Sequence, residues 1–267
     1  MARRVDEPLE ACTGLDESMR RPSTARMYDV FLGGKDNYAV DRKAAREAEE
    51  AAPSIVRAAR DNRRFMHRTV AWCAGEAGID QFVDIGTGMP TSPNAWEVAR
   101  RFAAGAVVVG VDNDPVVLAH DRARLGGMPI VAGDVRDPGA VIAGLGEVID
   151  WGRPVAVLLV AVLHFVTDQQ DPAGIVASLV ERLAPGSAVV ISHVCSSGAD
   201  PRVVAEVERV YAGTPTPGKF RTHEQIAGLF GGLRMVSPGV VQVQHWPIDA
   251  GPVTALPVLG GVGRVAR

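Results

Sequence analysis

The sequence contains few cysteines, aromatic residues and lysines, and this scarcity argues against several classes of protein. Its three cysteines, Cys12, Cys73 and Cys195, are far apart and lack C-x-x-C spacing, so neither a disulfide framework nor a zinc knuckle is expected. Aromatic residues make up 5% of the 267 residues, lysine occurs three times, and the formal net charge is −3. No long basic block is present, so we expect no nucleic-acid partner.

Long hydrophobic runs are also missing. The longest, Val155–Val166, has 12 residues, fewer than the roughly 18 that a membrane-spanning helix needs. It predicts instead a strand that is buried on both faces, as in a parallel sheet. Residues 1–14 contain no apolar stretch of a secretory signal, so we expect a cytoplasmic protein with no membrane partner. Residues 1–20 are polar and predict a flexible tail.

Helical patterns dominate residues 21–78. Arg42–Ala52 is rich in good helix formers, and Ser54–Ala77 repeats apolar residues at helical spacing. From residue 79 onward, short Val/Ile/Leu runs alternate with helical stretches. This alternation predicts an α/β, Rossmann-like fold with an open, mainly parallel sheet and helices on both faces. We therefore predict a helical cap over 21–78 and one sheet domain over 79–267.

The strongest motif is Val83–Gly88, VDIGTG, where the first predicted strand ends. Ligands of open parallel sheets bind at this end of the strands, although a tight glycine turn without a ligand would have the same sequence. Two later strand ends favour a ligand, because Asp112 suits vicinal ribose hydroxyls and Asp134 suits an adenine amino group. At these strand ends, the predicted cofactor-binding residues are Asp84, Gly86, Thr87, Gly88, Asp112, Asn113, Asp134 and Val135.

The loop differs from one that binds a dinucleotide. It lacks a third glycine, and the two prolines of Met89–Pro93 remove backbone donors that a pyrophosphate would use. S-adenosylmethionine has no phosphate, and its amino-acid end, sulfonium and nucleoside suit this loop better. A nicotinamide-dependent oxidoreductase and a non-catalytic S-adenosylmethionine-binding module remain as alternatives.

These motifs resemble those of class I S-adenosylmethionine-dependent methyltransferases, with DIGTG, VDNDP, GDV and LAPGSAVVIS in the expected order. From about residue 22, the chain also resembles a methyltransferase family of GC-rich Gram-positive bacteria with largely unassigned substrates. The segments that carry this second resemblance are Arg21–Asp29, Leu32–Tyr38, Asn62–Arg63, Phe82–Gly88, Val111–Pro115, Ala161–Phe165 and Val258–Val262. The resemblance implies a seven-stranded sheet whose last strand is antiparallel, with Gly260–Gly261 as a kink or bulge. It also implies methyl transfer to an O, N or C nucleophile of a small-molecule acceptor.

The segment Tyr28–Tyr38 combines aromatic, acidic and glycine residues between two helical stretches. It predicts either a simple helix–loop–helix or a lid over the cofactor. As a lid, it would place the ring of Tyr28 or of Tyr38 near the sulfonium. Asn37 and Arg63 would hold the cofactor carboxylate, and Gly34 lies in the same predicted binding segment.

His164 follows the fourth predicted strand and has two interpretations. It is a candidate general base for the acceptor, or a histidine that closes the strand through backbone hydrogen bonds. Asp168 and His193, at nearby strand ends, are weaker candidates. No set of His, Cys and Asp residues has metal-ligand spacing, so we expect no catalytic metal.

Overall fold

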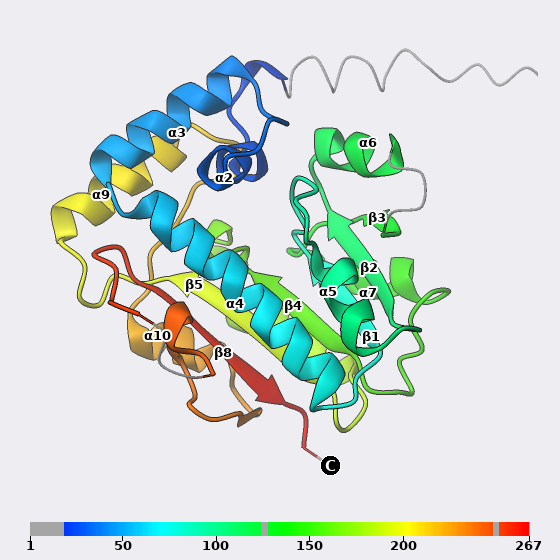
Figure 1. Cartoon of the computed structure of the whole chain (residues 1–267). Coiled ribbons are helices and arrows are strands. Elements are labelled where there is room, and N and C mark those ends of the chain that lie inside the picture. The colour runs from blue at the N-terminus through cyan, green and yellow to red at the C-terminus, as the bar shows by residue number, and fades with distance from the viewer. Residues whose placement is uncertain (1–18, 124–127, 248–250, 267) are drawn as a thin grey trace, which may run out of the picture.

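The computed structural model describes residues 19–123, 128–247 and 251–266 (Figure 1). Cys12 and the predicted tail up to residue 18 lie outside the described residues. The α-helices are α2 (Thr24–Leu32), α3 (Ala39–Ala51), α4 (Ile55–Gly75), α5 (Ala95–Phe102), α6 (Pro115–Ala123), α7 (Pro138–Leu145), α8 (Pro172–Arg182), α9 (Pro201–Tyr211) and α10 (His223–Gly228). The strands are β1 (Gln81–Ile85), β2 (Val107–Asp112), β3 (Ile130–Ala132), β4 (Ala156–Val160), β5 (Ala188–Val194), β6 (Arg234–Met235), β7 (Val241–Gln242) and β8 (Val258–Arg264).

Within the described residues, the strands form one eight-stranded sheet in the order β3-β2-β1-β4-β5-β8-β6, and β7 also pairs with β8. Strands β1 to β5 are parallel, whereas β8 runs antiparallel to β5. This confirms the predicted α/β class and the antiparallel last strand. The predicted count of seven is wrong, because β6 and β7 both form before β8. Pro238 and Gly239 separate them, and a proline has no N–H for a sheet hydrogen bond.

Two local predictions also need correction. The apolar run Val155–Val166 is not one strand, because β4 ends at Val160 and a 3₁₀ helix, η1, occupies Leu163–Phe165. Ala161 turns the chain between them with a φ of 59°, in the left-handed region. Gly260 forms no bulge, since β8 pairs residue for residue with β5. A Cβ on Gly260 would lie 2.7 Å from the ring of Phe65, so this glycine lets α4 approach β8 closely.

The sheet is covered on both faces, as the buried strands predict. One core lies between the sheet and helices α4 and α5, and includes Phe82 and Phe65. The other lies against α7, α8 and the end of α10, and includes Val83, the next residue along β1. Figure 1 shows α4 running across the sheet. Of the described helices, none is both long and apolar enough to cross a membrane.

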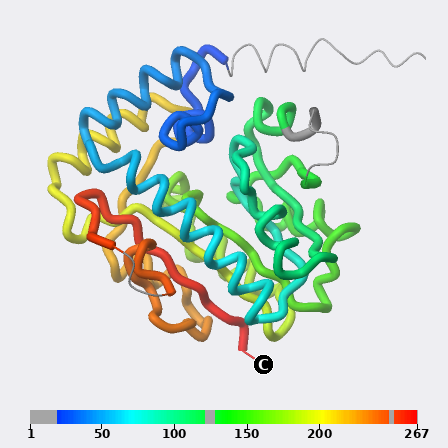
Figure 2. The backbone as a smooth tube through the Cα atoms, in the orientation of Figure 1, coloured from blue at the N-terminus to red at the C-terminus, as the bar shows by residue number. Residues whose placement is uncertain are grey.

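A third core joins α2, α3, the first turns of α4 and α9. Its buried residues include Met27, Ala48, Ile55 and Val207. Figures 1 and 2 show α2 and α3 at one end of the sheet, with α3 beside α9. Because α9 comes from the second half of the chain, the N-terminal helices pack onto the same body as the sheet. Helix α4 contributes to this core at its start and to the sheet core along the rest of its length.

Candidate functional site

The loop after β1 is held tightly between two neighbouring strands. The backbone N–H groups of Gly86 and Thr87 both donate to the carbonyl of Val111, at 2.8 and 3.2 Å. Gly86 and Gly88 have φ values of 71° and 68°, which favour glycine. A Cβ on Gly86 would lie 2.7 Å from Cγ2 of Val162. The loop therefore leaves no room for a side chain on the side of β4.

Asp112 closes the end of β2 beside this loop. The N–H of Gly88 donates to its Oδ2 and the N–H of Asp114 to its Oδ1, each at 2.9 Å. The side chain is buried, and this burial raises the pKa of the Asp112 carboxyl to about 6 against the opposing effect of the backbone donors. Each carboxylate oxygen can accept a further hydrogen bond. The geometry therefore presents an oriented carboxylate to a donor in the cavity.

The end of β3 carries a second acid in a different environment. Asp134 accepts hydrogen bonds from the backbone and the guanidinium of Arg136, and these lower its pKa to about 2. Asn113 donates from Nδ2 to Oδ2 of Asp134 at 2.9 Å, so the side chains that follow β2 and β3 meet. Val135 is buried next to them. This corner combines an apolar wall with a carboxylate that stays charged at neutral pH.

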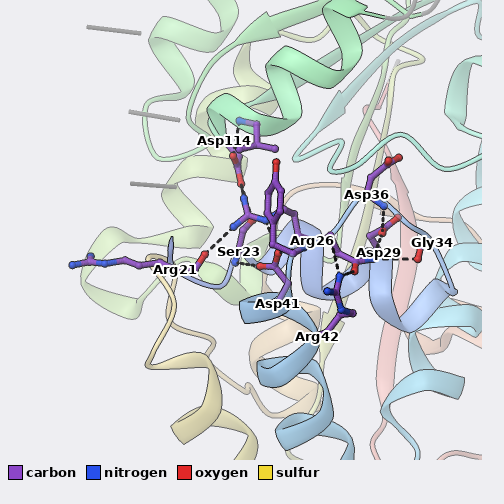
Figure 3. A network of polar contacts seen from close by, with 12 residues as sticks. Arg21, Ser23, Arg26, Asp29, Gly34, Asp36, Asp41, Arg42 and Asp114 are labelled. Carbon is purple, nitrogen blue, oxygen red and sulfur yellow. Dashed lines mark hydrogen bonds and ion pairs between the residues drawn. The ribbon is translucent and has the colours of Figure 1, made fainter. Parts of the chain in front are cut away.

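A buried polar network joins the N-terminal helices to the end of β2 (Figure 3). Ser23 donates from its hydroxyl to Oδ2 of Asp114 at 2.6 Å, and Nη1 of Arg26 lies 3.6 Å from the same oxygen. Arg26 also forms an ion pair with Asp41 at 2.8 Å, and both side chains are fully buried. Asp114 in turn accepts the N–H of Val116 and donates its own N–H to Asp112. The network fixes α2 and α3 against the cofactor loop.

Three side chains from α2 and α4 form the next part of the site. Asn62 donates to the hydroxyl of Tyr28 at 3.0 Å, and this hydroxyl donates to the carbonyl of Ala59. Nη2 of Arg63 donates to the carbonyls of Thr91 and Pro93. Oδ1 of Asn62 and Nε of Arg63 are enclosed and form no hydrogen bond. Such atoms are rare in folded proteins, and both Asn62 and Arg63 line a cavity.

Gly34 and Asn37, which were predicted to bind the cofactor, lie between α2 and α3. Nδ2 of Asn37 donates to Oδ2 of Asp29 at 2.8 Å and to the carbonyl of Gly34. A Cβ on Gly34 would lie 1.9 Å from Oδ1 of Asp29, so glycine is required beside that carboxylate. Figure 3 shows this cluster beside the Arg26–Asp41 pair. Gly34 and Asn37 thus shape the turn between α2 and α3.

His164 lies in η1, buried against two aromatic rings. Its ring centroid is 4.3 Å from that of Phe165 and 5.5 Å from that of His193. Burial lowers the pKa of His164 well below its usual value, and Nδ1 has no hydrogen-bond partner. His193 instead contacts Arg221, whose Nη1 lies 2.8 Å from its Nε2. Arg221 also binds Asp168 at 2.7 Å, so Asp168 and His193 serve to hold this buried arginine.

One cavity of about 520 Å³ connects these groups, a volume within the range of about 300–1,000 Å³ that is usual for ligand sites. The predicted site residues that line it are Tyr28, Arg63, Asp84, Gly86, Thr87, Gly88, Asp112, Asn113, Asp134, Val135 and His164. Gly34 and Asn37 do not line it. Its residues suit S-adenosylmethionine, because Asp112, with its oriented carboxylate, and Arg63, with its guanidinium, line one cavity.

Sequence reasoning missed several residues of this site. Asp114 precedes Pro115, the first residue of α6, and this pair is a recognisable helix start. The hydrogen bond between Ser23 and Asp114 could not be predicted from a local pattern, because the two residues are 91 positions apart in the chain. Nor did any local pattern indicate that Arg221 would be buried. Among the residues that the structure describes, no group of three or more His, Cys, Asp or Glu side chains could hold a metal ion.

The fold is that of the class I S-adenosylmethionine-dependent methyltransferases. Human N-acetylserotonin methyltransferase matches 96% of this chain and 67% of its own, with a TM-score of 0.50 at 12% identity. An O-methyltransferase family protein from Burkholderia thailandensis matches 96% of this chain and 68% of its own, with a TM-score of 0.52 at 14% identity. These distant likenesses show the fold alone.

The sequence profile of the S-adenosyl methyltransferase family matches residues 11–266, so the chain belongs to this family and its cofactor is S-adenosylmethionine. A DUF574 family protein from Streptomyces avermitilis is 38% identical, with a TM-score of 0.88 over 93% of this chain and 99% of its own. A Thermobifida fusca protein described as a candidate methyltransferase is 36% identical, with a TM-score of 0.86 over 95% of this chain and 98% of its own. No curated protein sequence matches the chain. The predicted family is confirmed.

Proposed function

We propose that this protein transfers a methyl group from S-adenosylmethionine to a small-molecule acceptor. The observation that carries the proposal is the buried carboxylate of Asp112, held by the N–H groups of Gly88 and Asp114 at the wall of the cavity. When bound, the cofactor would supply a methyl group on a sulfonium. A nucleophile of the acceptor would attack the methyl carbon, S-adenosylhomocysteine would leave as a neutral thioether, and the acceptor would lose a proton.

The nucleoside would lie at the ends of β1 to β3. We assign Asp112 to the ribose hydroxyls, and Asp134 with Val135 to the adenine. Asn113 positions the carboxylate of Asp134 through its hydrogen bond. The loop formed by Asp84, Gly86, Thr87 and Gly88 would hold the cofactor through its backbone. Within it, the hydroxyl of Thr87 donates to Oδ2 of Asp84 at 3.1 Å.

The amino-acid end would lie toward α4. Arg63 has an enclosed Nε without a partner, and a guanidinium is well suited to a carboxylate. Tyr28 is held by Asn62 and the carbonyl of Ala59, so its ring has a fixed position at the wall of the cavity. Helices α2 and α3 would exclude water from this end and act as the lid. Since Gly34 and Asn37 do not line the cavity, their part in binding would be to support that lid.

His164 would act on the acceptor. Its low pKa keeps the imidazole neutral at pH 7, so it can accept a hydrogen bond from a hydroxyl or amine. The same low pKa makes it a weak base. We therefore assign it mainly to orientation of the acceptor, since methyl transfer gains much from proximity alone.

The start of α5 disfavours a dinucleotide. Asn94 accepts the N–H of Glu97, and Oε2 of Glu97 accepts the N–H of Asn94. The backbone N–H groups of Asn94 and Glu97 are therefore already bonded to side chains of the same helix start. The carboxylate of Glu97 would also repel a pyrophosphate placed there.

Calorimetric titration of the full chain tests the cofactor. We expect S-adenosylhomocysteine to bind with one molecule per chain, and a nicotinamide dinucleotide to give no heat. Heat with the dinucleotide alone would refute the proposal. Turnover is then tested with labelled S-adenosylmethionine and a panel of small acceptors; tight cofactor binding without transfer to any acceptor would favour a non-catalytic binding module.

A further inference from the structure

The cavity continues past the cofactor residues into the core between the N-terminal helices and α9. We call this part the apolar chamber and define it by Phe31, Ile55, Phe165, Val207, Tyr211 and Phe220. All six line the cavity. Phe31, Ile55, Val207 and Phe220 belong to one buried cluster against which Tyr211 packs, and the ring of Phe165 lies 5.7 Å from that of Tyr211. The chamber is therefore one continuous apolar surface.

The charged side chains that α2 and α9 add to the cavity wall are already engaged. Oδ2 of Asp29 accepts the backbone N–H of Asp36 at 3.0 Å. Oε1 of Glu208 accepts the N–H of Phe220 at 2.9 Å and lies 3.7 Å from Nζ of Lys219. Both carboxylates would repel an anionic ligand, and α2 and α9 add no lysine or arginine to the cavity wall that could pair with one. An anion placed among these rings would lose its hydration without gaining a partner.

Two neutral polar groups border the chamber. Within the described part of the chain, the hydroxyl of Tyr211 forms no hydrogen bond to protein, and burial raises its pKa, so it stays protonated. His164 stays unprotonated, and its Nδ1 has no partner. The hydroxyl of Tyr211 can therefore donate to a ligand, whereas Nδ1 of His164 is enclosed.

We propose that the methyl acceptor is a neutral molecule with an aromatic ring and a hydroxyl or amine substituent, the ring lying in the apolar chamber and the substituent meeting the hydroxyl of Tyr211. This inference rests on the proposed function, because it places the acceptor beside the cofactor in the same cavity. Aromatic rings favour this chamber, since Phe165 and Tyr211 offer faces and edges for stacking.

Binding of 1-naphthol tests the proposal without any need for turnover. We would titrate 1-naphthol and its anionic counterpart, 1-naphthoate, into the full chain saturated with S-adenosylhomocysteine at pH 7.5. We expect 1-naphthol to bind at least tenfold more tightly than 1-naphthoate. Equal affinities, or a preference for the anion, would overturn the neutral aromatic class.

Two tyrosine variants locate the site. Tyr211→Phe removes a hydroxyl without a protein partner, so the fold should persist, and 1-naphthol should bind about fivefold more weakly, the value of one hydrogen bond. Naphthalene, which lacks the hydroxyl, should bind both proteins alike. Tyr38→Phe is the matched control, since Tyr38 does not line the cavity, and it should change neither affinity. An unchanged affinity in Tyr211→Phe for 1-naphthol would overturn the placement.

The cofactor titration separates the two proposals. If S-adenosylhomocysteine binds but 1-naphthol does not, the chamber is refuted and the proposed function stands. If S-adenosylhomocysteine itself fails to bind, the proposed function falls, and the acceptor class that rests on it falls as well.

Discussion

The backbone N–H of Gly88 donates to Oδ2 of Asp112 at 2.9 Å, so the glycine loop after β1 is tied to the acid that ends β2. The two residues are separated by 24 positions in the chain. Because the same carboxylate also accepts the N–H of Asp114, its orientation is fixed before any ligand arrives. Under the proposed assignment, binding of the ribose to Asp112 would then need little reorganisation of this residue.

The pH dependence of cofactor binding should follow Asp112. Its pKa is raised to about 6 by burial, and ribose hydroxyls that donate to it would favour the charged form. Affinity for S-adenosylhomocysteine should therefore rise as the pH increases through about 6 and level off above that value. Asp134 and His193 have pKa values of about 2 and about 4, so neither titrates in this window. Calorimetry between pH 5 and 8 measures the effect.

Asp112→Asn is the control for that experiment. It keeps the shape of the side chain but removes the charge, so we expect the pH dependence near 6 to disappear and binding to weaken by roughly 1.5–3 kcal/mol, the value of hydrogen bonds to a charged group. A variant that retained the same pH profile would show that another group titrates.

Gly86→Ala should abolish cofactor binding through a clash as well as through backbone strain. A Cβ there would lie 2.7 Å from Val162, and φ is 71°. Gly78→Ala is the matched control, because Gly78 has a φ of 68° but no atom within 4 Å of the added Cβ. We expect Gly78→Ala to lose about 1–2 kcal/mol of unfolding free energy and to bind S-adenosylhomocysteine normally. Normal binding by Gly86→Ala would contradict the tight loop.

Arg26→Met should strongly destabilise the protein. It leaves Asp41 fully buried without its ion-pair partner, which costs about 3–5 kcal/mol of unfolding free energy in comparable cases. Arg153→Met is the control, since the Arg153–Asp80 pair is about half exposed and should contribute no more than about 1 kcal/mol. Denaturant unfolding compares the two variants, and similar losses would mean that the buried pair has no special role.

Arg63→Gln should selectively weaken binding of the cofactor's amino-acid end. The wild-type protein should prefer S-adenosylmethionine over 5′-methylthioadenosine, which has the nucleoside but no amino-acid carboxylate. Arg63→Gln should lose most of this preference, whereas Arg64→Gln, at an exposed neighbouring position, should keep it. If Arg63→Gln weakened both ligands equally, the guanidinium would be supporting the loop through Thr91 and Pro93 instead of binding the carboxylate.

The sheet and the group of acids at its edge could be predicted because their signals are local. Each parallel strand is a short apolar run, and Asp84, Asp112 and Asp134 lie where such runs end, so topology alone brings them to one edge. Strand β4 was predicted too long, because an apolar run does not reveal a turn such as the one at Ala161. The bulge predicted at Gly260 was wrong, since the glycine is needed for a contact with Phe65 from a distant helix.

The apolar chamber could not be predicted, because its residues come from parts of the chain that are far apart in the sequence. The apolar chamber combines Phe31 from α2, Phe165 from η1 and Tyr211 from α9, and their meeting depends on how the N-terminal helices pack onto the sheet. In the sequence these residues look like ordinary core positions. The buried ion pair between Arg26 and Asp41 could not be predicted either, because the sequence does not distinguish a buried arginine from an exposed one.

The most direct measurement is an experimental structure of the full chain with S-adenosylhomocysteine. We expect the ribose hydroxyls within hydrogen-bond distance of the Asp112 carboxylate, the cofactor carboxylate on Arg63, and the sulfur facing the space beside His164. A ligand bound with its ribose away from Asp112, or with its sulfur turned from His164 and the apolar chamber, would contradict the assignment of this cavity as a methyl-transfer site.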